Sequence, residues 1–226
     1  MLNAIIRKLL PYMLLAIGFK ILVYVFENTD WWPQMENPGI ILGVVGFGIA
    51  VLLGAKLSVV NTRLYSIEDK VCLIVGSLRI MKNINGLGPK VHNWSSDFES
   101  TLRDPEKTGI VNLREKTDNL VRDCVDAGHD SSNLSGFSRD VSFVLHRATA
   151  EIPIAYENFL SMMTTIYTIT IALVITGIAG FIGIFIVVLV LVGSAILIED
   201  MDHPLDYGKL SMIRVNLEPL THFNSK

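Results

Sequence analysis

The longest uninterrupted apolar segment of the chain limits its possible folds more than any other feature. Residues 158–198 are 41 consecutive positions without Asp, Glu, Lys or Arg. One straight helix of that length would extend for about 60 Å, twice the roughly 30 Å of a bilayer's hydrocarbon core. Gly177 and Gly180 offer the best interior break, because glycine is a poor helix former. We therefore expect a transmembrane hairpin within residues 154–198, with helices at about 154–176 and 181–198.

Two further apolar segments lie nearer the N-terminus. Residues 9–26 contain one charge, Lys20, and residues 39–60 contain one, Lys56, which is near enough to the end of its segment to reach the membrane interface. A cleaved signal peptide is the alternative interpretation of the first segment, but no small-x-small cleavage site precedes Glu27. With 50% of all residues hydrophobic, the sequence predicts an all-α membrane protein with four transmembrane helices, two of them in residues 1–60.

The distribution of charge predicts how these helices are oriented, because Lys and Arg concentrate on the cytoplasmic side of membrane proteins. Residues 27–38 contain three acidic residues and no Lys or Arg. Residues 61–153 contain twelve Lys and Arg, and the N-terminus and the tail at 199–226 contain five more. We expect a multi-pass protein of the inner or plasma membrane whose two termini, central domain and tail are cytoplasmic.

Residues 61–153, between the second and third spans, are expected to form a helical cytoplasmic domain. Apolar positions at helical spacing extend the second span into a helix over residues 65–81, and amphipathic helices are expected at 106–127 and 139–150. Clusters of Gly, Asn, Ser and Pro predict loops at 83–90 and 131–138.

The sequence carries no enzyme motif. It lacks HExxH, GxSxG and a phosphate-binding loop, its five histidines are scattered, and Cys72 and Cys124 are too far apart for a CxxC pair. A net charge of only -3 does not indicate a nucleic-acid-binding protein. We therefore expect no enzymatic activity, no cofactor and no nucleic-acid partner.

A group of acidic residues follows the fourth span. Asp200, Asp202 and Asp206 carry carboxylates of the kind that bind calcium. They lack the regular alternation and the bidentate end of a calcium loop. A solvated boundary that ends the helix before Pro204 is the interpretation that we favour over a metal site.

Three apolar side chains of the second span share one face. Phe47, Val51 and Ala55 are spaced four residues apart, which places them on one helical stripe. Several copies of this helix around an axis would form a narrow apolar constriction that gates ions by dewetting. Packing of the stripe against lipid or a neighbouring span is the alternative, and spacing alone favours that alternative.

Several short segments of the chain resemble the bestrophins, a family of pentameric ion channels of animals, plants and bacteria. The sequence Glu-Ile-Pro-Ile-Ala-Tyr-Glu at 151–157 is similar to the family's Ile-Pro-x-x-Tyr at the start of the third membrane helix. Residues 53–65 resemble the end of its second helix, and Gly-Ser-Leu-Arg at 76–79 resembles a Ser-Arg motif downstream. Residues 199–204 and 210–217 are similar to the acidic junction and the amphipathic helix that follow the fourth span.

This resemblance implies a channel that passes small monovalent ions, chloride and other anions foremost, through the pore of a homopentamer surrounded by membrane lipids. It implies that Phe47, Val51 and Ala55 form the neck, and that Ile152, followed by Pro153, forms a second constriction at the cytoplasmic aperture. Cation preference is the alternative. Glu151 and Glu157 would favour cations if they faced the pore, whereas Lys56 would favour anions.

The sequence also departs from the family pattern. Ala55 stands where the family has an aromatic residue, so the lower neck is either wider than in relatives or displaced by one turn. The run of aspartates that binds calcium in animal members has no counterpart after Pro204. A non-conducting membrane scaffold or regulatory protein with a bestrophin-like frame is the alternative to a channel.

Overall fold

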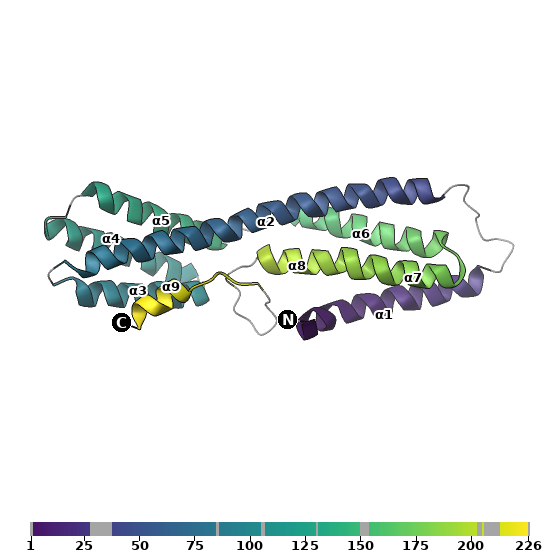
Figure 1. Cartoon of the computed structure of the whole chain (residues 1–226), viewed down its shortest axis with the longest axis horizontal. Coiled ribbons are helices and arrows are strands. Elements are labelled where there is room, and N and C mark those ends of the chain that lie inside the picture. The colour runs from purple at the N-terminus through teal and green to yellow at the C-terminus, as the bar shows by residue number, and fades with distance from the viewer. Residues whose placement is uncertain are drawn as a thin grey trace. The chain divides into compact units, whose positions relative to one another are not determined.

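The structure is a computed structural model in which every regular element is a helix within the residues that it describes (Figure 1). The chain divides into two compact units, one formed by Met1–Val60 with Glu151–Asp202 and the other by Asn61–Ala150 with His203–Lys226. The described residues are 2–27, 38–84, 86–104, 107–129, 131–149, 154–202, 205 and 213–225.

The first unit is built from long apolar helices that lie side by side in Figure 1. Among the described residues, three helical segments are long and apolar enough to cross a membrane, Ile6–Phe26, Leu42–Lys82 and Gly177–Asp202, and a shorter apolar helix covers Asn158–Val174. The elements are α1 (Leu2–Phe26), the first part of α2 (Pro38–Lys82), α6 (Ile154–Val174), α7 (Gly177–Val187), the π-helix η1 (Val188–Val192) and α8 (Gly193–Asp202).

A sharp turn separates α6 from α7. Gly177 begins α7 with a φ of +64°, a backbone conformation that favours glycine because other residues carry a Cβ. The backbone passes so close to Gly180 that a Cβ there would overlap the carbonyl oxygen of Ile175 and the side chain of Lys20. Both glycines of the expected break thus have a role in the turn, one through its φ and the other through close approach.

The second unit is a bundle of amphipathic helices. It contains the second part of α2, α3 (Gly88–Arg103), α4 (Lys107–Asp126), α5 (Ser131–Thr149) and α9 (Glu218–Asn224). At its centre the ring of Trp94 stacks on Phe98 with centroids 5.0 Å apart and contacts Phe137 at 5.1 Å. The buried indole N–H of Trp94 donates to the Thr117 hydroxyl at 3.1 Å, so this aromatic cluster leaves no indole donor unsatisfied.

Three sequence-based expectations about this unit were wrong. Helix α3 was not expected, and its residues 88–90 were assigned to a loop. Helix α5 begins at Ser131 instead of 139, because Leu134 and Phe137 are buried and extend its apolar face towards the N-terminus. Residues 213–217 are not helical. Val215 and Leu217 are buried, whereas Asn216 between them is exposed.

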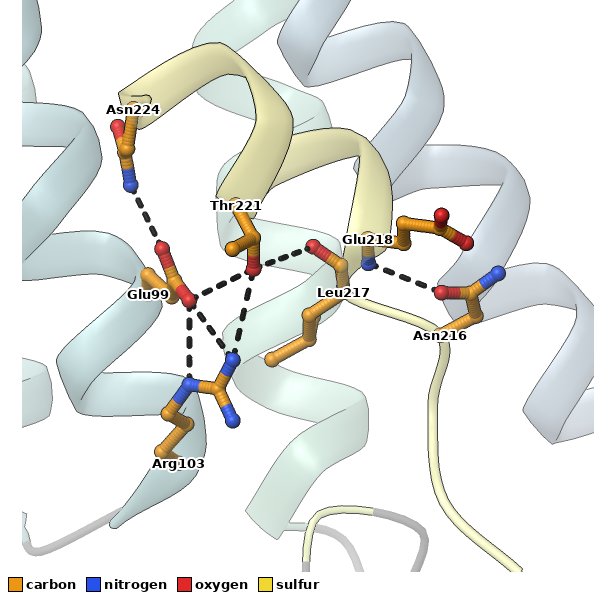
Figure 2. Close-up of polar contacts among 7 residues, drawn as sticks. All are labelled: Glu99, Arg103, Asn216, Leu217, Glu218, Thr221 and Asn224. Carbon is orange, nitrogen blue, oxygen red and sulfur yellow. Dashed lines mark hydrogen bonds and ion pairs between the residues drawn. The ribbon is translucent and has the colours of Figure 1, made fainter.

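Hydrogen bonds from α9 to α3 converge on one carboxylate, as Figure 2 shows. Glu99 Oε1 accepts hydrogen bonds from Arg103 at 2.8 Å and from the Thr221 hydroxyl at 2.9 Å. Its Oε2 accepts from the side-chain amide of Asn224 at 2.7 Å. Leu220 and Phe223 of α9 are also buried. Glu99 therefore links the last helix to the bundle through donors from two helices.

We expect the attachment of α9 to weaken at acid pH. Partial burial raises the pKa of Glu99, but hydrogen bonds from Arg103, Thr221 and Asn224 and the charge of Arg103 outweigh it and lower the pKa below its ordinary 4.5. Because the folded pKa is depressed, the ionised carboxylate stabilises the unit above pH 4.5, and this contribution is lost as pH falls through the lower folded value. Amide hydrogen exchange in α9, corrected for intrinsic rates, should therefore accelerate below pH 4.5.

Two variants separate this effect from general acid unfolding. In Glu99→Gln, the exchange of α9 amides should already be fast at neutral pH and should respond little to acidification. Glu115→Gln, on the exposed side of α4, should retain the wild-type response. Equal pH dependence in wild type and Glu99→Gln would show that another group controls the attachment.

Candidate functional site

The expected neck residues lie on a face of α2 that the first unit leaves uncovered. Phe47 is 74% exposed and Val51 is 53% exposed, and Ala55 is also exposed. On the other side of the same helix, Ile49, Leu53 and Val60 are buried. An uncovered row of apolar side chains on a helix of this kind fits a contact with lipid, with another subunit or with a pore.

Helix α6 fixes which way this face points. The Tyr156 hydroxyl donates to the carbonyl oxygen of Leu52 at 2.8 Å. The Tyr167 hydroxyl lies within 2.5 Å of the position that a Cβ on Gly46 would occupy. These contacts, at positions six residues apart along α2, hold its covered side against α6 and so leave the Phe47 stripe turned away from the unit.

Lys56 belongs to the covered side of α2. It is 6% exposed and lines a partly open groove of the first unit, whereas the neighbouring Ala55 is exposed. Its ammonium group is therefore not on the Phe47 stripe. Any influence of Lys56 on ions passing along that stripe would act through its electric field rather than through contact.

The other expected aperture residues fall where the structure gives no side-chain description. Glu151, Ile152 and Pro153 lie outside the described residues, and Glu157 belongs to α6 but its side chain is not described. Their roles remain predictions from the resemblance.

The acidic residues at the end of α8 are placed only in part. Asp200 and Asp202 are buried, and Asp200 pairs with Lys8 at 3.4 Å, while Asp206 lies outside the described residues. In the described part of the chain, no three His, Cys, Asp or Glu side chains come together as metal ligands. The pairing with Lys8 gives Asp200 a structural role at this end of the first unit.

A buried ion pair in the first unit was missed by the sequence analysis. Lys20 is fully buried and pairs with Glu27. Its ammonium group also donates to the carbonyl oxygens of Ala172 at 3.0 Å and Ile175 at 2.8 Å, and Glu27 accepts the backbone N–H of Gly177 at 2.9 Å. The available signal was a lone charge in an apolar helix followed seven residues later by an opposite one, because that spacing returns to the same helix face.

Several solved structures are similar to this chain over nearly its whole length. A bacterial bestrophin homologue from Klebsiella pneumoniae, in a crystal structure of a point variant, matches with a TM-score of 0.68 at 17% identity, over 97% of this chain and 100% of that one. A second structure of a bestrophin homologue from the same organism matches with a TM-score of 0.64 at 13% identity, over 94% and 93% of the two chains.

A crystal structure described only as that of a membrane protein matches with a TM-score of 0.69 at 17% identity, over 96% of this chain and 95% of that one. No protein-family model and no curated protein matches the sequence. The similarity covers nearly the full length of this chain and of each matched chain, so it includes the apolar helices of the first unit. The chain thus has a bestrophin-like fold, and its described residues include helices long and apolar enough to cross a membrane.

Proposed function

We propose that this protein is an ion channel in which several copies of the chain surround a pore lined by α2. The resemblance to bestrophins favours five copies. Small monovalent ions pass passively down their gradient. The observation that carries the proposal is the uncovered stripe of Phe47, Val51 and Ala55 on a chain with a bestrophin-like fold. In this arrangement the chain crosses the inner or plasma membrane four times, and both termini are cytoplasmic.

The stripe gates by controlling water. A ring of phenylalanine side chains narrows the pore and offers no hydrogen bonds, so water leaves the constriction. An ion would then have to cross it without its hydrating water, which raises the barrier to permeation. Phe47 contributes the widest side chain of the stripe, and Val51 narrows the next turn. Ala55 leaves the lower neck wider. A second constriction at Ile152, followed by Pro153, completes the pathway on the cytoplasmic side.

Selectivity follows from charge near these constrictions. The family resemblance favours chloride and other anions, and the field of the buried Lys56 would act in the same direction. Glu151 and Glu157 beside the exit would act in the opposite direction and favour cations. Reconstituted protein under opposed chloride and sodium gradients distinguishes the two cases by the sign of its reversal potential.

Replacing Phe47 with alanine tests the neck directly. Removing the ring widens the constriction, and a fall of about 1.4 kcal/mol in the barrier to permeation raises ion flux about tenfold. Flux is measured in proteoliposomes with matched protein content. Phe185→Ala is the control, because Phe185 is an exposed phenylalanine of α7 outside the stripe, and its flux should equal that of wild type.

Two outcomes would contradict the proposal. Unchanged flux and ion preference in Phe47→Ala would remove the pore assignment of the stripe. Absence of any flux from a well-formed wild-type oligomer would favour the alternative, a non-conducting scaffold or regulatory protein that retains the bestrophin-like frame.

A further inference from the structure

A pocket of the second unit is bordered by basic side chains from two distant parts of the chain. It lies between the C-terminal end of α2 and α9, has a volume of about 460 Å³ and is partly open to solvent. That volume is within the range typical of pockets for small ligands. Its lining among the described residues consists of Arg79, Lys82, Asn83, His222 and Phe223. The first four carry N–H donors in their side chains, and none of the five carries a carboxylate.

The last turn of α2 brings the two cationic side chains together. Arg79 and Lys82 are three residues apart, so they are neighbours on one face of the helix. Asn83 follows directly after the last helical residue. Like charges on neighbouring positions of a helix repel each other. An anion bound between Arg79 and Lys82 would remove this repulsion.

Helix α9 supplies the opposite wall of the pocket. The ammonium of Lys82 lies 5.5 Å from the centroid of the Phe223 ring, within the range of a cation–π contact. Phe223 is buried, which fixes the ring beside Lys82. His222, the residue before Phe223, is exposed and lines the same pocket. The pocket therefore requires α9 in its docked position.

The donors of the α2 wall are not occupied within the described part of the chain. There, the side chains of Arg79 and Lys82 form no hydrogen bond and no ion pair. The Phe223 ring has no oxygen or nitrogen acceptor, so the N–H donors of Lys82 remain available. The C-terminal end of a helix carries only about half a negative charge, less than the two positive charges of Arg79 and Lys82.

Two acidic residues near α9 do not neutralise the pocket. Glu99 already accepts hydrogen bonds from three side chains where α9 contacts α3. Glu218 lies one turn before His222 in α9, but it does not line the pocket and pairs with no cation among the described residues. The positive charge of the pocket is thus left for an external anion.

An anion with several oxygens suits this donor set better than a single halide ion. The guanidinium of Arg79 presents paired N–H groups that match two oxygens of one phosphate, and the ammonium of Lys82 adds a point charge. We propose that the pocket binds a terminal phosphate group, to which Arg79 and Lys82 donate from α2 and His222 donates from α9. A soluble phosphorylated molecule and a lipid with a terminal phosphate share this chemistry. The site does not depend on whether the protein conducts ions.

Inorganic pyrophosphate is the soluble probe of this site. The full chain in detergent is titrated with pyrophosphate at neutral pH, with sodium chloride keeping the ionic strength constant. Binding is measured by calorimetry, and amide hydrogen exchange of α9 is measured in parallel. Pyrophosphate should bind and slow the exchange of α9 amides, because a ligand held by both walls keeps α9 beside the end of α2.

A second arm tests a lipid source of the phosphate. Phosphatidic acid, whose headgroup is a terminal phosphate, is added to the detergent micelles and compared with phosphatidylcholine at the same mole fraction. Protection of α9 by pyrophosphate alone identifies a soluble ligand. Protection by phosphatidic acid, but not by phosphatidylcholine or pyrophosphate, identifies a lipid ligand. Either result supports the phosphate site.

Two variants and one control locate the binding, each with the probe that protects wild type. Arg79→Gln and His222→Ala remove one donor from each wall and should each weaken binding about tenfold, the effect of one lost charge-assisted hydrogen bond. Both residues are exposed, so both variants should fold. Arg122→Gln removes the same charge from an exposed position of α4 and should bind as wild type does.

The proposal is overturned if neither probe slows the exchange of α9 amides in wild type. It is also overturned if sodium chloride alone, at the same ionic strength, protects α9 as well as pyrophosphate does. Equal losses of affinity in Arg79→Gln and Arg122→Gln would likewise overturn it, because general attraction between charges would then explain the binding.

Discussion

Replacing Lys20 with methionine is expected to lower the free energy of unfolding by about 3 to 5 kcal/mol, the cost of removing one partner from a buried ion pair. Methionine preserves the length of the side chain but leaves the Glu27 carboxylate without its cation. It also leaves the carbonyl oxygens of Ala172 and Ile175 without the donor that they share. The thermal midpoint in detergent should fall by roughly 6 to 20 °C. Circular dichroism measures this midpoint.

A second variant shows whether the cost comes from the unpaired charge. Lys20→Met combined with Glu27→Gln removes both charges and should recover part of the loss, because replacing both partners of a buried pair costs less than breaking it. Lys90→Met is the matched control. It breaks the ion pair between Lys90 and Asp123, whose side chains are 57% and 35% exposed, respectively. The loss should be at most about 1 kcal/mol. Equal losses in Lys20→Met and Lys90→Met would contradict the interpretation.

Replacing Phe98 with alanine is expected to destabilise the second unit by about 3 to 5 kcal/mol, the usual cost of truncating a buried phenylalanine. Phe98 is fully buried and stacks on Trp94 at a centroid distance of 5.0 Å. Its removal leaves a cavity beside the indole ring, and stacking is lost in addition to buried area. Tryptophan fluorescence should change together with the lower denaturation midpoint, because Trp94 loses its neighbour.

Val111→Ala in α4 is the control for this substitution. Val111 is 63% exposed, so its truncation should change stability by no more than about 0.5 kcal/mol. A loss of stability in Phe98→Ala no larger than that in Val111→Ala would show that the aromatic cluster does not form the core of this unit.

The sequence predicted long helices better than short ones. Residues 107–126 have an apolar stripe at helical spacing with a polar opposite face, so both the existence and the ends of α4 could be read from the pattern within one or two positions. The start of α3 carries Gly88 and Pro89, which are typical of loops, although proline also suits the first turn of a helix. Buried Val91, Trp94 and Phe98 recur at helical spacing and were the stronger signal.

The orientation of side chains on α2 could not be predicted from periodicity. Both sides of this helix are apolar within the membrane segment, so hydrophobic spacing does not distinguish the side that α6 covers from the side that stays open. The buried position of Lys56 follows from tertiary packing, which no local pattern contains. The two carbonyl oxygens that accept from Lys20, those of Ala172 and Ile175, likewise lie more than 150 positions away in the sequence.

The division of the chain into two discontinuous units also constrains how it is made. The last segment of the second unit, His203–Lys226, leaves the ribosome only after the last segment of the first unit, Glu151–Asp202. The contact between Glu99 and Thr221 joins residues 122 positions apart and cannot form until the apolar hairpin has been synthesised. A seven-residue helix is too short to be stable alone. Docking of α9 is therefore a late step of biosynthesis, completed after the hairpin is available for insertion.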